Sequence, residues 1–90
     1  MKQFKTIIYK LRKAVEQKKQ LFSASEPDAY REELLNLAVL HIDNLEKQIP
    51  DEKFFATTHP NTVKTILKNY KLAEEELMDE INAIQETYSS

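Results

Sequence analysis

The chain contains no glycine among its 90 residues, and this absence limits its possible folds more than any other feature. Type I′ hairpin turns and phosphate-binding loops both need backbone freedom that glycine supplies at little cost. Glycine-rich nucleotide loops are therefore excluded, and a β-rich fold is disfavoured. Cysteine is also absent, which removes disulfides and thiolate metal sites and suits a reducing compartment.

Apolar residues recur at helical spacing in three segments, which predict helices over about residues 2–22, 27–49 and 60–88. Steps of three and four alternate most regularly in the third segment. Short connections favour antiparallel neighbours. We therefore predict one all-α domain, residues 1–90, folded as an up-down-up antiparallel three-helix bundle.

Proline marks both ends of the predicted connection between the second and third helices. Pro50 lacks an N–H and disfavours helix at the preceding residue, so the second helix should end there. Pro60 suits the first turn of the third helix, with Thr58 or His59 as its cap. Residues 50–59 are accordingly predicted to form a loop. At the other connection, Ser23-x-x-Glu26 and Ser25-x-x-Asp28 both resemble capping boxes.

The stretch "LLNLAVLHI", residues 34–42, is apolar around more than half of a helix. Such a helix should contact neighbours on two or more sides, as the central helix of a bundle or as part of a dimer contact. Val39 and Leu40 fall outside the predicted core stripe, so homodimerisation is one way to complete the bundle. That stripe consists of Tyr30, Leu34, Leu37, Ala38, His41, Ile42, Leu45 and Ile49.

The third helix should be roughly 40 Å long, which exceeds the other two. We expect its last turns to overhang the bundle. Ile81, Ile84 and Tyr88 would then form an exposed apolar strip unless another chain covers it.

Charge alternates in blocks along the chain. Residues 1–22 carry a net +6, residues 26–52 a net −6, residues 53–71 a net +4 and residues 72–90 a net −6. In the predicted bundle the acidic block "EEELMDE" would face Lys13, Lys18 and Lys19 of the first helix. Complementary charges of this kind fix helix orientation more than they add stability, and they would also let two copies pair head to tail.

No residue pattern indicates catalysis, a metal ion or a cofactor. His41 is expected in the core stripe, hydrogen-bonded to Tyr70, Tyr9 or Glu74, because a phosphotransfer histidine should face water. Glu74 lies on the apolar face of the third helix and should pair with Lys18 or His41, since an unpaired buried charge is costly.

The predicted loop holds the best binding candidates, Phe54 and Phe55. They either close the open end of the bundle or anchor a protein partner, because exposed aromatic residues commonly dominate interfaces. The full set of predicted partner-binding residues is Phe54, Phe55, Val39, Leu40, Ile84 and Tyr88.

These patterns predict a small non-enzymatic protein that binds and regulates another protein. Eleven lysines against two arginines hint at a bacterial or phage genome, and a cytoplasmic location is expected because no apolar run can span a bilayer. The basic first helix leaves nucleic-acid or anionic-membrane binding open. The net charge of −2 and the scarcity of arginine make nucleic acid the weaker option.

Residues 34–50, "LLNLAVLHIDNLEKQIP", resemble the second helix and following proline of the cytoplasmic immunity proteins that protect producers of class IIa bacteriocins. The resemblance implies immunity to a membrane-active peptide as an alternative function. It also implies a four-helix bundle, whereas the periodicity here gives three long helices.

Overall fold

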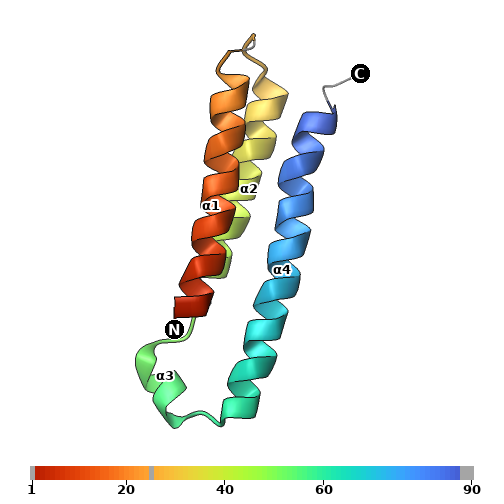
Figure 1. The fold of residues 1–90 in the computed structure, drawn as a ribbon. Coiled ribbons are helices and arrows are strands. Elements are labelled where there is room, and N and C mark those ends of the chain that lie inside the picture. The colour runs from red at the N-terminus through yellow and green to blue at the C-terminus, as the bar shows by residue number, and fades with distance from the viewer. Residues whose placement is uncertain (1, 25, 88–90) are drawn as a thin grey trace.

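The computed structural model describes residues 2–24 and 26–87, with side chains through residue 84. Its helices are α1 (Lys2–Phe22), α2 (Ala29–Lys47), α3 (Glu52–Thr57) and α4 (Pro60–Thr87). No strand occurs in the described residues, so the fold is all-α. Figure 1 shows α1, α2 and α4 side by side, with α3 at the end where α1 begins. Each long helix packs against the other two, and the molecule measures 51 × 19 × 16 Å.

One apolar core runs between the three long helices. Phe4, Leu11, Ile42 and Ile81 are its largest fully buried side chains. The Tyr70 hydroxyl also enters the core and donates a hydrogen bond to the Leu45 carbonyl oxygen at 3.1 Å. The buried apolar residues are Phe4, Ile7, Ile8, Leu11, Val15, Leu35, Ala38, Ile42, Tyr70, Leu77, Ile81 and Ile84.

Asp28 is the residue that caps α2, in place of the predicted Ser23, and Ser25 lies outside the described residues. Its carboxylate accepts hydrogen bonds from the backbone N–H groups of Tyr30 at 2.9 Å and Arg31 at 3.2 Å. Helix α2 therefore begins at Ala29, two residues later than predicted from the sequence. A cap of this kind satisfies two of the four free N–H groups at a helix start.

The predicted loop over residues 50–59 contains a short helix, α3, which was not predicted from the sequence. Asp51 caps it by accepting a hydrogen bond from the Phe54 N–H at 2.8 Å. The imidazole of His59 accepts a hydrogen bond from the Asn61 N–H at 3.1 Å, just before α4 begins at Pro60. Local capping thus builds a short piece of helix between two prolines.

Helix α2 is rotated relative to the predicted stripe. Ala38 and Ile42 are buried as predicted, and Leu40, predicted outside the stripe, is 53% exposed. Leu35 is also buried, whereas Tyr30 and Leu37, predicted in the stripe, are 57% and 45% exposed. The prediction that His41 lies in the core is wrong, since its side chain is exposed on the surface. The observed rotation keeps the imidazole in contact with water, which avoids the cost of burying an unpaired polar group.

The overhang of α4 lies at its start and not at its end. Ile81 and Ile84 are 0% and 3% exposed, so the predicted exposed strip is wrong for both. Figure 1 shows the first turns of α4 reaching past the beginning of α1, where α3 lies against them. Val63, Ile66 and Leu67 in these turns are half-buried.

Ion pairs join α2 to α1 through Arg12, and to α4 through His41 and Glu80. The guanidinium of Arg12 on α1 lies 2.8 Å from the Asp43 carboxylate and 2.6 Å from that of Glu46. These hydrogen bonds raise the pKa of Arg12. All three side chains are partly exposed, and such pairs typically contribute at most about 1 kcal/mol, so the Arg12 cluster orients the helices more than it stabilises them. Lys18 lies beside Ile81 and Asn82 of α4.

Candidate docking surface at the end that carries α3

The two adjacent phenylalanines of α3 have different surroundings. The half-buried Phe55 ring lies 5.3 Å from Phe4, which in turn packs edge-on against Tyr70 at 4.9 Å. The Phe54 ring lies 5.7 Å from Phe55, nearly perpendicular to it, and is 37% exposed. Successive residues on a helix point about 100° apart, so one ring anchors α3 and the other faces outward.

A groove of about 470 Å³ lies between α3, the start of α4 and the start of α1. Its walls are mainly apolar because the overhanging turns of α4 have no long helix covering them on this side. Phe55, Pro60, Val63 and Leu67 supply the apolar walls, and Gln3 and Lys64 supply polar groups. An open apolar groove with a few polar groups is the usual form of a binding site for a peptide or small ligand.

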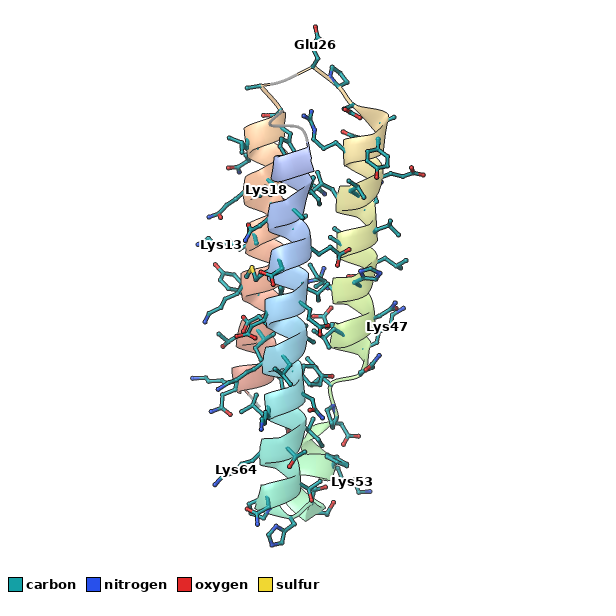
Figure 2. The ribbon with its side chains drawn as sticks, turned by 90° about the vertical axis from the view of Figure 1, so that its right-hand side faces the viewer. Lys13, Lys18, Glu26, Lys47, Lys53 and Lys64 are labelled. Atoms are coloured by element: carbon teal, nitrogen blue, oxygen red, sulfur yellow. The ribbon has the colours of Figure 1, made fainter. Side chains whose placement is uncertain are left out.

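Lysines surround this end of the molecule. Lys2 and Lys5 project from the first turns of α1, and Lys64 from the first turns of α4, all exposed. Figure 2 shows Lys53 and Lys64 at the end that carries α3, and Glu26 at the opposite end. Residues 53–71 contain four lysines and no acid, and Asp51 and Glu52 are the acidic residues at the start of α3. Lysines therefore outnumber carboxylates around the groove.

A second concave region, of about 610 Å³, lies between α1 and the end of α2. Here Lys5 and Arg12 face Glu46, Asp51 and Glu52, so charges of both signs line the surface. The Arg12 guanidinium is already bonded to two carboxylates. We therefore take the more apolar groove beside α3 as the candidate docking surface.

The predicted partner-binding residues are dispersed over the molecule. Phe54 and Phe55 lie at the α3 end, whereas Leu40 is exposed in the middle of α2. Val39 is half-buried against the core, and Ile84 is buried within it. Tyr88 lies outside the described residues. The structure thus brings together the two phenylalanines with the start of α4, and separates them from Leu40 and Ile84.

His41 pairs with Glu80 and not with its predicted partners Tyr70, Tyr9 or Glu74. The Nδ1 atom of His41 lies 3.2 Å from a carboxylate oxygen of Glu80, on the surface between α2 and α4. Glu74 is half-buried beside Glu75 and Met78. Glu80, further along α4, thus occupies the role that was predicted for Glu74.

Arg31 is a buried residue that was not predicted from the sequence. Only 8% of it is exposed, and its guanidinium lies 4.2 Å over the Phe22 ring. It also donates a hydrogen bond to the Glu26 carbonyl oxygen at 3.0 Å. These contacts close the connection between α1 and α2. The burial of Arg31 could not be predicted from the sequence, because arginine is usually exposed. The presence of Phe22 and Pro27 nearby in the sequence does not indicate it either.

Tyr70 supports the aromatic cluster beneath α3, and its environment predicts a loss of stability at high pH. Burial raises the pKa of the Tyr70 phenol above its ordinary value of 10.0. Above about pH 10 the unfolded chain loses a proton that the folded chain retains, so stability that is present below this pH declines as the pH rises. We expect Tyr70→Phe to cost about 1 kcal/mol near neutral pH, through the lost hydrogen bond to Leu45.

Urea unfolding at about pH 8 and at about pH 11 tests this origin of the pH dependence. The wild-type chain should lose more stability between the two conditions than Tyr70→Phe does. Tyr9→Phe is the matched control, because this phenol is 63% exposed, and it should lose as much as the wild type. Equal losses in the wild type and Tyr70→Phe would refute the assignment to Tyr70.

The arrangement of side chains and helices also bears on metal ions and membranes. Over the described residues, no cluster of three or more histidine, aspartate and glutamate side chains is placed to hold a metal ion. In the same part of the chain, no helix has both the length and the apolar character needed to cross a membrane.

Comparison with protein-family models, with curated protein sequences and with solved structures finds no match.

Proposed function

We propose that the chain is a small non-enzymatic regulatory protein, an up-down-up bundle of three long helices, that acts by binding another protein. The observation that carries the proposal is the apolar groove beside α3, which is lined by Lys64 and by Phe55. The 37% exposed ring of Phe54 packs against Phe55. Exposed aromatic residues beside an apolar pocket are typical anchors of protein interfaces.

The chemistry of the groove favours an acidic amphipathic segment as its ligand. Val63 and Leu67 lie one turn apart and offer an apolar strip of a length that a short helix can cover. Lys64 lies between them in sequence and is exposed, so acidic side chains flanking an apolar anchor would meet positive charge. Complementary charge of this kind speeds association and excludes basic partners.

Selection from a displayed library of helical peptides tests this proposal and needs no identified partner. The wild-type chain is the bait, and peptides that bind the support without the protein are removed. We expect the enriched peptides to carry aspartate and glutamate between apolar residues at helical spacing. Their dissociation constants should rise at least tenfold for Val63→Asp and for Lys64→Glu, as measured by fluorescence anisotropy.

Leu72→Asp is the matched control, because Leu72 is a 50% exposed leucine on the same helix, remote from the groove. It should bind the enriched peptides as the wild type does, and circular dichroism should show native helicity in all variants. Enrichment of basic peptides would contradict the proposal. An equal loss of affinity in Leu72→Asp and in Val63→Asp, relative to the wild type, would also contradict it. Binding to phosphatidylglycerol vesicles or duplex DNA in place of the peptides would assign the lysines to a membrane or to nucleic acid.

Immunity to a membrane-active bacteriocin is the second candidate function. The support for this function is the resemblance of residues 34–50 to that family. In the described residues, the bundle consists of the three long helices that pack against one another, and the six-residue α3 is not a fourth helix of the bundle. Expression in a bacteriocin-sensitive strain tests this function directly. Survival of the strain would favour it, and Phe54→Asp would then show whether the α3 end contributes.

A further inference from the structure

The outward face of α2 carries a seam of exposed side chains that runs along the helix. Its members are separated by alternating steps of three and four residues, the spacing of a coiled-coil contact. All of them are exposed, and the two central ones, Leu37 and Leu40, are 45% and 53% exposed. The seam consists of Tyr30, Glu33, Leu37, Leu40, Asn44 and Lys47.

The seam is complementary to a second copy of itself in one orientation. If two copies run antiparallel about a twofold axis between Leu37 and Leu40, each Leu37 meets the partner's Leu40. Glu33 then meets the partner's Asn44, and Lys47 of the partner lies one turn away. A parallel arrangement would instead place Glu33 against a second Glu33 and Lys47 against a second Lys47, which is unfavourable.

The charges of the whole molecule favour the same orientation. Lysines 53 and 64 mark the end that carries α3, and Glu26 marks the other end (Figure 2). Antiparallel copies would bring Glu26 of one chain towards Lys53 and Lys64 of the other. Parallel copies would place Lys53 and Lys64 of one chain beside those of the other.

From this complementarity we infer that the chain forms an antiparallel homodimer through the outward face of α2, with Leu37 and Leu40 at its centre. The groove beside α3 lies at the end of the molecule, so a dimer of this form carries one groove at each of its two ends.

Analytical ultracentrifugation of the wild-type chain and of a Leu37→Glu, Leu40→Glu variant tests the inference. We expect a wild-type dimer, and a dimer dissociation constant at least tenfold higher in the double variant, with circular dichroism showing unchanged helicity. Leu72→Glu is the matched control and should dimerise as the wild type does, because its equally exposed leucine lies on α4. A monomeric wild-type chain at about 200 μM, well above the micromolar range of specific interfaces, would overturn the inference.

Single cysteine substitutions test the orientation, because the chain has no native cysteine to interfere. In the antiparallel dimer Glu33→Cys faces Asn44→Cys, so a mixture of the two variants should form disulfide-linked heterodimers. Glu33→Cys alone should remain uncross-linked, since its two thiols would lie roughly 16 Å apart along the helix axis. Efficient cross-linking of Glu33→Cys to itself, with little heterodimer in the mixture, would refute the antiparallel arrangement.

Discussion

Phe4→Ala is expected to lower the free energy of unfolding by about 3–5 kcal/mol, which is a large share of the total stability of a domain of this size. Phe4 is fully buried, and its ring contacts Phe55 of α3 and Tyr70 of α4. Removing it leaves a cavity at the point where three helices meet. Chemical denaturation followed by circular dichroism at 222 nm measures the loss.

Phe54→Ala is the matched control, because it also truncates a phenylalanine that packs against Phe55. Phe54 is 37% exposed, so we expect its removal to cost less than about 1 kcal/mol. If the two variants were equally stable, the aromatic cluster would not attach α3 to the bundle. The proposed groove would then lose its support, since Phe55 forms one of its walls.

The all-helical fold was predictable because the chain lacks glycine and because α1 and α4 have strong periodicity. Helix α1 spans the predicted residues 2–22, and α4 begins at the predicted Pro60. Both helices have a single clear apolar face, so spacing alone places them. The short α3 was missed, because six residues are too few to show a period. Its signal was Asp51, placed to cap the N–H of Phe54.

The face that α2 buries was not predictable from its pattern. Residues 34–42 are apolar around most of the helix, so several rotations bury a similar amount of apolar surface. The structure selects the rotation that buries Leu35 and leaves Leu37 exposed. Contacts distant in sequence decide it, notably Arg12 with Asp43 and Glu46, and His41 with Glu80. Such pairs become apparent only when the neighbouring helices are in place.

The candidate site was predictable only in part, because the position of the overhang depends on how the connection folds. Phe54 and Phe55 were identified as aromatic residues between two prolines. Val63 and Leu67, which form other walls of the groove, belong to the regular apolar spacing of the third segment, and that spacing alone marks them as core residues. Their partial exposure follows from the path of residues 48–59, which carries the start of α4 beyond α1. Helix periodicity contains no information on that displacement.

Ile81→Ala and Ile66→Ala together test which end of α4 lies outside the core. Both variants remove the same atoms from the same helix, and they differ only in burial. Ile81 is 0% exposed between α1 and α2, so its truncation should cost about 2–5 kcal/mol. Ile66 is half-buried in the overhanging turns, where solvent and side chains can fill the space, so we expect roughly 1–2 kcal/mol.

The order of the two losses is the informative result, because each measured value depends on how well its surroundings relax. Urea unfolding of both variants gives this order and requires no binding partner. A larger loss in Ile66→Ala would place the acidic end of α4 outside the bundle, and the groove beside α3 would be filled. A larger loss in Ile81→Ala would establish that the apolar surface available to a partner lies at the lysine-rich end. Both the proposed binding of acidic segments in the groove and the inferred dimer with a groove at each end depend on that result.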